Sequence, residues 1–345
     1  MFKAIGKNPS GSHLKKIRES SNYYNGAFHN LEPTEVTLKE VSSLRLIKGF
    51  FSKPDSVKPA GPLGVAPVDL RDTRSESLLI TWFGHSSYFI RTNKYTILVD
   101  PVFSGYASPV AFIGKSFLTR EVVRVEELPD IDLLIITHDH YDHLDYATIR
   151  ELRDKVKRVV TPLGVGAHLR YWGYSPESII ELDWWEELEL ASDLCITCMP
   201  ARHFSGRGVR RNQTLWGSFA LRVQGSSLFL GGDSGYGRHF EEIGERMGAF
   251  DLAILECGQY GEFWPYIHML PEQTLQAALD LNSRILMPVH WAKFVLAFHP
   301  WDEPIERLTR AAENKDIEII APRPGEIFSL NNYQEKDPWW KRTED

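Results

Sequence analysis

Cysteine is scarce in this chain, and long apolar runs are missing from it. Three cysteines in 345 residues are too few, and odd in number, for a disulfide framework, which predicts a reducing compartment. No stretch approaches the ~20 apolar residues of a membrane-spanning helix, and the N-terminal Met1–Lys7 is too weakly apolar for a secretory signal. We therefore expect a soluble body in the cytoplasm.

Two familiar binding motifs are incomplete. The segment Gly231-Gly232-Asp233-Ser234-Gly235 lacks both the Walker lysine and the GxGxxG frame, so no nucleotide site is expected. Cys195 and Cys198 have the CxxC spacing, but residues three apart on a strand face opposite sides. We expect both cysteines in the core and not in a redox or zinc site.

Charge is segregated along the chain. The first 60 residues hold ten Lys or Arg and five Asp or Glu, whereas the whole chain has a net charge of −7, so the remainder carries −12. An acidic body argues against a nucleic-acid partner, because the phosphate backbone requires a basic track. At 43% hydrophobic and 25% charged residues, the composition is that of a globular protein.

The basic segment is expected to form an N-terminal arm, residues 1–67, ahead of a catalytic domain at 68–345. Apolar and basic residues alternate within it, a composition that suits an anionic lipid surface, here the inner face of the membrane; the apolar ones are Leu44, Leu46, Ile47, Phe50 and Phe51. The arm could instead pack these residues on the body, which Gly49 and Pro54 favour because they limit a helix. The four prolines between Ser52 and Pro67 predict a connecting loop.

Strand-like and helix-like patterns are interspersed along the remaining chain. The predicted strands are 78–83, 87–91, 95–99, 132–137, 194–200, 217–223, 227–231, 251–256, 284–289 and 317–321, and the predicted helices 144–155, 240–248, 271–282 and 304–314. The apolar runs are continuous, as expected for sheets that are covered on both faces. The pattern predicts a layered α/β protein.

One hexapeptide, His138–His143, contains three imidazoles and two carboxylates. It follows the apolar run Leu133–Ile136, which reads as a buried strand. His138 and His140 would share a face and point together, whereas Asp139 would point away and is not expected to bind metal. Asp142 and His143 could serve a second ion roughly 3.5–4 Å from the first. The alternative is a histidine-rich polar surface loop.

Three further candidate ligands follow strand-like runs downstream. His203 follows 194–200, Asp233 follows the run that ends in Gly231-Gly232, and His290 follows 284–289. Glycine at 231 and 232 would let the backbone approach an ion closely. Four strand ends that each deliver a ligand favour a metal site over a surface loop.

On these residues the chain resembles the metallo-β-lactamase fold hydrolases, whose HxHxDH signature stands here at His138–His143. Within them it resembles the N-acyl-phosphatidylethanolamine-hydrolysing phospholipase D family, through five more segments: Trp82-Phe83-Gly84-His85, Asp100-Pro101-Val102-Phe103-Ser104, Gly231–Tyr236, His268-Met269-Leu270-Pro271-Glu272 and His290-Trp291. They span about residues 75 to 300. The resemblance implies a four-layer αβ/βα sandwich.

The resemblance also implies a ligand set. It places His138, His140 and His203 on one metal, Asp142, His143 and His290 on the other, with Asp233 bridging. Two divalent ions, Zn²⁺ foremost with Fe²⁺ or Mn²⁺ as alternatives, would share a water and lower its pKa, so that hydroxide attacks a phosphorus or carbonyl centre. Asp233, Asp142 and His268 would be the catalytic residues.

Three residues around the ligands have open interpretations. Asp100 could orient a metal-binding imidazole or form a turn before Pro101. His85 could lie near the metals or be a structural histidine. His268 could contact a substrate phosphate or assist the leaving group, or it could simply precede a helix that starts at Pro271.

Several functions fit such a centre. A phospholipase D-like phosphodiesterase would need an apolar channel, for which aromatic side chains are available: Trp184, Trp185, Trp216, Phe263, Trp264, Tyr266, Trp291, Phe294 and Phe298. A lactonase or phosphodiesterase of a small soluble substrate could use Arg202, Arg207, Arg210 and Arg211 to bind a phosphate. A nuclease and a non-catalytic scaffold are weaker alternatives. The oligomeric state stays open, a homo-oligomer included.

Overall fold

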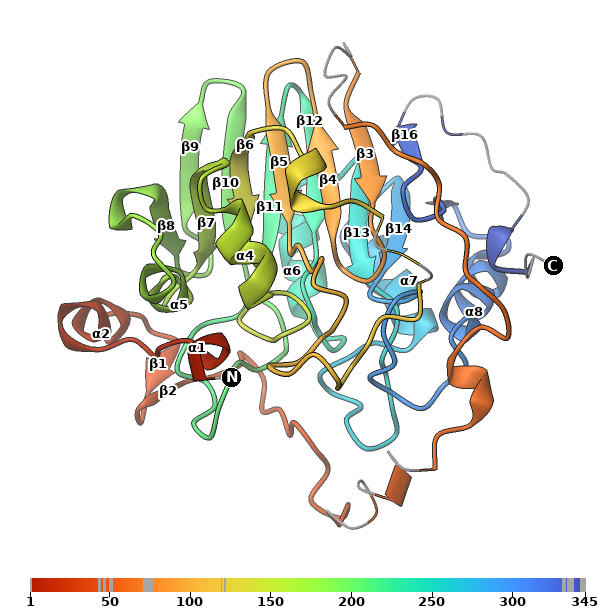
Figure 1. Cartoon of the computed structure of the whole chain (residues 1–345), viewed down its shortest axis with the longest axis horizontal. Coiled ribbons are helices and arrows are strands. Elements are labelled where there is room, and N and C mark those ends of the chain that lie inside the picture. Colours follow the sequence, from red (N-terminus) through yellow and green to blue (C-terminus); the bar gives the residue numbers. More distant parts are fainter. Residues whose placement is uncertain are drawn as a thin grey trace.

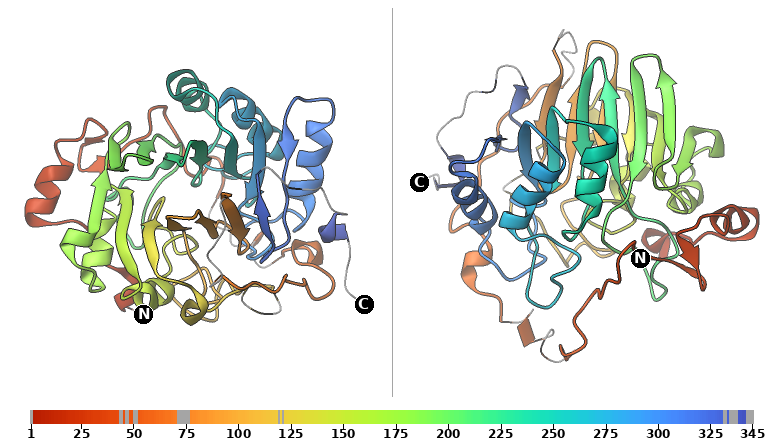
Figure 2. Two further views of the ribbon diagram at one scale, coloured as in Figure 1. Left: turned by 90° about the horizontal axis from the view of Figure 1, so that it is seen from above. Right: turned by 180° about the vertical axis from the view of Figure 1, so that it is seen from behind.

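The computed structural model of this chain describes residues 2–42, 45, 48–49, 52–70, 77–118, 120, 122–330, 333 and 338–341. Two seven-stranded sheets face each other, and helices cover both outer faces (Figure 1; Figure 2, left). This arrangement confirms the predicted four-layer αβ/βα sandwich.

The first sheet has the order β16-β3-β4-β5-β6-β7-β8. Its strands are β16 (Ile327–Ser329), β3 (Leu79–Trp82), β4 (Tyr88–Arg91), β5 (Thr96–Val99), β6 (Ile131–Ile135), β7 (Val156–Pro162) and β8 (Ile179–Leu182). Strands β16 to β5 pair antiparallel, whereas β5 to β8 pair parallel. Parallel pairing requires crossover connections, and the metal motif lies in the crossover that leaves β6.

The second sheet has the order β15-β14-β13-β12-β11-β10-β9. Its strands are β15 (Glu318–Ile319), β14 (Ile285–Val289), β13 (Leu252–Glu256), β12 (Ser226–Leu230), β11 (Ser218–Val223), β10 (Leu194–Met199) and β9 (Glu187–Ala191). Again one half is antiparallel, β9 to β12, and the other parallel, β12 to β15. The parallel strands of both sheets deliver their carboxyl ends to the same edge of the sandwich.

The helices follow from the apolar faces that the sheets must cover. On the first sheet lie α4 (Tyr146–Leu152) and α5 (Gly166–Tyr171); on the second lie α6 (His239–Met247), α7 (Pro271–Asp280) and α8 (Glu303–Ala312). In β5, Ile97 and Val99 join the large core cluster, whereas Leu98 packs in a second cluster with Ile149 of α4. Burial on both faces explains why the apolar runs are continuous.

The predicted strands and helices coincide with observed ones to within a few residues, but six strands and three helices of the described residues were missed, of which four strands and one helix lie in the body. Strands β7, β8, β9 and β16 and helix α5 had no predicted counterpart; β7 begins Val-Lys-Arg, and its first half is exposed or half-buried. One core prediction is wrong: Cys198 is buried, but Cys195 is only half-buried, beside Arg222. Among the described residues no helix is long and apolar enough to cross a bilayer.

The described residues of the N-terminal arm contain α1 (Phe2–Ile5), α2 (Gly11–Ile17), the short strands β1 (Tyr23–Tyr24) and β2 (Ala27–Phe28), and a 3-10 turn, η1 (Asp55–Val57). Three more 3-10 turns lie in the body: η2 (Val125–Glu127), η3 (Pro176–Ser178) and η4 (Trp339–Lys341). From α1 and α2 the arm passes along the edge of the sandwich where the site loops gather (Figure 1). Leu44, Leu46, Ile47, Phe50 and Phe51 lie outside the described residues.

Candidate metal centre

The predicted ligands come together at the carboxyl ends of the parallel strands. Thr137–His143 follows β6, Asp233 follows β12 and His290 follows β14, and the loops gather at the lower edge in Figure 1. Gly232 allows the two sheets to meet here, since a Cβ atom on it would lie 2.8 Å from the Gly217 carbonyl oxygen and from Thr137 Cβ. The approach places Asp233 beside the hexapeptide.

Three imidazole nitrogens converge in the first group. His138 Nε2 lies 2.9 Å from His140 Nδ1, which lies 3.2 Å from His203 Nε2. Asp233 Oδ2 is 3.7 Å from both Nε2 atoms. Their ligand atoms all lie within 4.8 Å of one another, the arrangement of a site that holds one cation.

Hydrogen bonds on the far side of two rings leave the converging nitrogens free of protons. Thr137 Oγ1 donates to Asp100 Oδ2 at 2.6 Å, so it accepts from His138 Nδ1 at 3.0 Å. His203 Nδ1 donates to the Ile267 carbonyl oxygen at 2.9 Å. In both rings Nε2 is therefore the lone-pair nitrogen, as metal binding requires.

A second group lies next to the first and shares Asp233 with it. His143 Nε2 is 3.1 Å from Asp233 Oδ1 and 3.6 Å from Asp142 Oδ2. His290 Nδ1 is 3.2 Å from Asp233 Oδ1. His85 is fully buried and places Nε2 2.9 Å from Asp142 Oδ2. Asp100 Oδ2 accepts from His143 Nδ1 at 2.7 Å.

The residues fit divalent ions. Among the buried side-chain atoms of the described residues, His143 Nε2 and Asp233 Oδ1 have no hydrogen-bond partner, although each faces other ligand atoms. Leaving buried polar atoms unpaired is costly, and a cation between them would satisfy both. The buried histidine and aspartate cluster is therefore suited to a dinuclear metal site.

The pKa values of the candidate ligands also bear on whether the cluster can bind a cation. Burial, together with the neighbouring imidazoles of His143 and His140, holds the pKa of His138 well below its usual value, which keeps that ring neutral. Burial would raise the pKa of Asp233, but His143 and His290 outweigh it and hold that pKa well below its usual value. Burial also lowers the pKa of His140, His203 and His290. Burial would lower the pKa of His143 too, but the carboxylates of Asp233, Asp142 and Asp100 outweigh it and raise that pKa well above its usual value. Imidazoles and carboxylates are a donor set that a divalent ion binds, and a cation at His143 would displace the proton from the nitrogen that binds it.

Backbone strain is concentrated at this edge. His85, Asp100 and His290 have φ of 52°, 41° and 69°, and Gln259 beside them has 59°. A positive φ is uncommon for residues other than glycine, least so for Asn, Asp and His, and costs on the order of 1 kcal/mol or more each. Packing around the site holds these residues in that conformation.

Comparisons with known proteins agree with this geometry. The sequence model of the "Beta-lactamase superfamily domain" matches residues 95–291. The chain belongs to the β-lactamase superfamily. With the two-sheet fold and the clustered ligands, it is a metal-dependent hydrolase of the metallo-β-lactamase fold.

Relatives within the superfamily cover most of the chain. An uncharacterised protein of Mycobacterium tuberculosis is 40% identical over 94% of this chain and 88% of its own length. "N-acyl-phosphatidylethanolamine-hydrolyzing phospholipase D 1" of Caenorhabditis elegans is 28% identical over 78% of this chain and 81% of its own. The metallo hydrolase Igni18 of Ignicoccus hospitalis shares the fold, with 21% identity, a TM-score of 0.55 and coverage of 75% of this chain and 100% of its own.

A cavity of about 360 Å³ opens onto the candidate ligands of this superfamily member. One part of its lining consists of ligands and His268, and another is apolar, formed by Val36, Phe204, Trp264, Ile267 and Leu296. It adjoins a second cleft of about 530 Å³, with which it shares His140, Asp142, Phe204, Arg211 and Leu296. Of the nine aromatic residues considered for an apolar channel, Trp264 lines this cavity, whereas Trp216 and Trp291 belong to the core.

The structure separates the four arginines proposed for phosphate binding. Arg202 donates to Thr34 Oγ1 and to the carbonyl oxygens of Pro33 and Tyr236, and Arg207 is buried with its guanidinium bonded to carbonyl oxygens. The expectation that these two bind phosphate is therefore wrong. Arg211 is exposed and lines both clefts.

His268 lies in the cavity wall and faces a carboxylate. Its Nδ1 is 3.5 Å from Glu256 Oε2, at the end of β13. Burial would lower the pKa of His268, but the Glu256 carboxylate outweighs it and raises that pKa. A protonated imidazole in the wall can donate a proton to a leaving group.

Sequence reasoning missed several residues that shape the site. Glu256 stands at the end of a predicted strand, the feature that identified His290 as a candidate, but it was not considered as a site residue. Asn30, Val36 and Thr37 belong to the arm and carry no motif, yet Val36 and Thr37 line the cavity. Asp139 points away from the ligands, as expected, and accepts from Gly206 N and Thr214 Oγ1.

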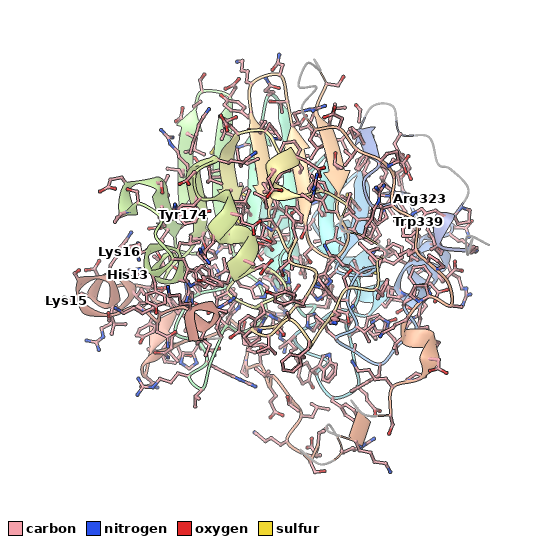
Figure 3. All side chains as sticks on the ribbon, in the orientation of Figure 1. His13, Lys15, Lys16, Tyr174, Arg323 and Trp339 are labelled. Atoms are coloured by element: carbon pink, nitrogen blue, oxygen red, sulfur yellow. The ribbon has the colours of Figure 1, made fainter. Side chains whose placement is uncertain are left out.

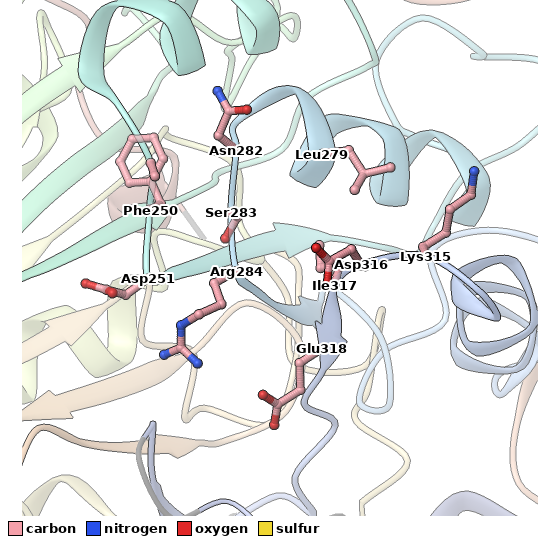
Figure 4. A pocket seen from close by; sticks show the side chains of 11 residues that line it. Phe250, Asp251, Leu279, Asn282, Ser283, Arg284, Lys315, Asp316, Ile317 and Glu318 are labelled. Atoms are coloured by element: carbon pink, nitrogen blue, oxygen red, sulfur yellow. The ribbon is translucent and has the colours of Figure 1, made fainter.

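A further hollow lies at the opposite ends of the second sheet's strands (Figure 4). It has a volume of about 780 Å³ and includes Asp251, Arg284 and Glu318, which stand at or just before the starts of β13, β14 and β15. Cations and carboxylates alternate around it, and among the described residues no cluster of metal ligands lies there. We assign it no role in the chemistry.

Proposed function

We propose that this hydrolase is a phospholipase D-like phosphodiesterase acting on N-acyl-phosphatidylethanolamine or a related phospholipid. The observation that carries the proposal is the cavity beside the candidate ligands, which combines an apolar wall with the guanidinium of Arg211, 5.1 Å from the centre of the Phe204 ring. A phospholipid presents the same pair of features, acyl chains beside a phosphodiester. The similarity to the C. elegans phospholipase D supports the assignment.

In this proposal His138, His140 and His203 would hold one ion, Asp142, His143 and His290 the other, and Asp233 would contact both. Two divalent ions, with zinc the first choice, would supply Lewis acidity and a nucleophile from water near neutral pH. Arg211 would bind the phosphate through charge-assisted hydrogen bonds. His268, held by Glu256, would protonate the leaving oxygen.

The surroundings of the cavity support a lipid surface as the source of substrate. Phe112 is 76% and Ile113 55% exposed, and Val209 is fully exposed. Phe112 and Ile113 line a cleft of about 680 Å³ that also includes Lys53, Lys58 and Lys115. Exposed apolar side chains among cations suit an anionic bilayer, and we propose peripheral contact there. The free cysteines agree with a cytoplasmic location.

A second candidate is hydrolysis of a small soluble phosphodiester or lactone. The cavity at the ligands, about 360 Å³, is at the small end for ligand pockets. Arg211 would serve a soluble phosphate equally well.

The test is a product assay with metal-loaded protein. We expect phosphatidic acid from vesicles of N-acyl-phosphatidylethanolamine, measured by mass spectrometry, and no release by Asp233→Asn. Plain phosphatidylethanolamine and a soluble phosphodiester or lactone, assayed in parallel, separate the candidates. Turnover of the soluble substrates alone would refute the lipid proposal; turnover of none of them would refute both.

A further inference from the structure

The two ligand groups are supported by different parts of the chain. The second group rests on the body of the sandwich: Asp100 accepts from His143 Nδ1, and His290 N donates to the His85 carbonyl oxygen at 2.9 Å. Asp100 and His85 follow strands β5 and β3 of the first sheet. The first group rests in part on the N-terminal arm, at two separate places.

The first place is His203. The side chain of Asn30 pairs with the backbone of this residue in both directions: Asn30 Nδ2 donates to the His203 carbonyl oxygen at 2.8 Å, and His203 N donates to Asn30 Oδ1 at 3.0 Å. Trp216 Nε1 also donates to Asn30 Oδ1, at 3.0 Å. A single arm residue thus fixes the backbone that carries a ligand.

The second place is the back of the hexapeptide, where Arg207 joins the arm to the motif. Its NH1 donates to the carbonyl oxygens of Asp139 and Leu144, both at 2.7 Å. Its Nε and NH2 donate to the Ala4 carbonyl oxygen at 3.1 and 2.7 Å. The Asp139 peptide lies between His138 and His140, so the same guanidinium that holds the two ligands in place depends on an arm carbonyl.

His168 makes a parallel connection. Lys7 N donates to His168 Nδ1 at 3.0 Å, so the proton sits on Nε2, which donates to Asp139 Oδ2 at 3.2 Å. Trp172 Nε1 donates to the Lys3 carbonyl oxygen at 2.8 Å. Asp139, Arg207 and His168 are all buried. Without the arm, buried donors of Arg207 and Trp172 would lose their acceptors, and the loop would rearrange.

We expect the arm to detach more readily than the rest of this network. Helices α1 and α2 have 4 and 7 residues, too few to be stable alone, and the described residues of the arm add no strand to either large sheet. Helix α2, which carries His13 (labelled in Figure 3), sits against the edge of the body, where His13 Nε2 lies 2.7 Å from Glu181 Oε2. Segments held in this way open at lower free energy than core strands.

We propose that residues 3–30 of the arm set the metal affinity of the first group, His138, His140 and His203, more strongly than that of the second group. The inference rests on the proposed dinuclear centre and is independent of the substrate. Displacing the arm would weaken the binding of the first ion more than that of the second. The arm is then a positioning element for half of the metal centre.

The experiment compares Asn30→Ala with Asn22→Ala, in the full chain. Asn22 is an arm residue whose side chain donates to Asp183, away from the ligands. Each protein is loaded with Zn²⁺, dialysed against chelators of graded strength, and its metal content measured by elemental analysis. We expect two ions per chain in the wild type and in N22A. In N30A we expect one ion to be bound roughly 10- to 100-fold more weakly, the usual effect of losing a partner that holds a ligand.

Single-site reference variants identify the ion that is lost. His203→Ala should lack the first ion and His290→Ala the second, and the visible spectrum of the Co²⁺-loaded forms distinguishes the two. We expect Co²⁺-loaded N30A, at limiting metal, to match H203A. A match to H290A, equal weakening of both ions, or wild-type affinity in N30A would overturn the inference.

Two further measurements distinguish a failure of this proposal from misfolding of N30A and from a failure of the proposed dinuclear centre. If metal-free N30A is unfolded by circular dichroism, Trp172→Phe takes its place. It removes the donor to Lys3 and keeps an aromatic ring beside Arg207 and His168, and we expect a smaller loss at the same ion. Unchanged affinity in a folded W172F would then count against the proposal. Fewer than two ions in the wild type would instead refute the dinuclear centre.

Discussion

Replacing Asp100 by Asn tests how the second ligand group is oriented. Asp100 Oδ1 accepts from Thr137 N at 2.8 Å, and Oδ2 accepts from Thr137 Oγ1 and from His143 Nδ1. Asparagine keeps the first bond but puts an NH₂ group where Oδ2 stood. His143 Nδ1 can accept a hydrogen bond from this NH₂ group only if the ring carries its proton on Nε2 instead. Nε2 is the atom that faces Asp142 and Asp233.

The expected magnitudes follow from those contacts. Loss of the partner that fixes a ligand's tautomer should weaken the second ion about 10- to 100-fold, roughly 1.4–2.8 kcal/mol. The lost charge-assisted hydrogen bond should lower the free energy of unfolding by about 1.5–3 kcal/mol. The backbone does not confound the comparison, because Asp100 has a φ of 41° and asparagine tolerates that region as well as aspartate.

Asp132→Asn is the matched control. Asp132 lies at the other end of β6 and accepts from Thr96 N, Thr96 Oγ1 and Lys157 Nζ. The D132N variant therefore disturbs a similar number of hydrogen bonds, but far from the candidate ligands. Chelator competition and urea titration should show weaker metal binding in D100N alone. If D100N bound both ions as tightly as D132N and the wild type, the assignment of Asp100 as the residue that orients His143 would be refuted.

Three further outcomes are expected. Phe229→Ala should lower the free energy of unfolding in urea by about 3–5 kcal/mol, because this fully buried ring packs between Phe240 and Phe250; a loss below about 1 kcal/mol would contradict that packing. Burial lowers the pKa of His239 to about 3, so the fold keeps it neutral while the unfolded chain takes up a proton below about pH 6.5. Stability is therefore lost as pH falls from 6.5 towards 3, at up to about 1.4 kcal/mol per pH unit from this residue, and His239→Gln should flatten the loss in urea titrations between pH 7 and 5; an unchanged slope would argue against it. Arg211→Ala should raise KM for a phosphodiester roughly tenfold or more while the exposed neighbour variant Arg210→Ala does not, and equal effects in steady-state assays would remove Arg211 from the site.

The fold was predictable because its apolar runs are long and because candidate metal ligands follow directly after several of them. The run Leu133–Ile136 and the hexapeptide after it identify a strand and a ligand loop at once, and the same pattern recurs before His203 and His290. Strand β7 escaped because Lys157 and Arg158 interrupt its apolar pattern. The family resemblance, and not periodicity, supplied the number of layers.

The residues that hold the candidate ligands and His268 in place were harder to predict, for a physical reason. Asn30 and His203 are separated by 173 positions, and a hydrogen bond to backbone leaves no constraint on the partner's side chain. Arg207 was assigned to substrate because charge is visible in a sequence and burial is not. Glu256 resembles any buried strand end until the neighbouring loop places His268 against it.

The left-handed residues at the ligand edge carry a consequence for engineering this chain. At His85 and His290 a glycine would relieve the backbone strain, but it would also remove a buried imidazole and leave a cavity. The packing lost is worth more than the strain relieved, which is on the order of 1 kcal/mol per residue. A library screened only for folding should therefore retain both histidines, and with them the geometry of the metal centre.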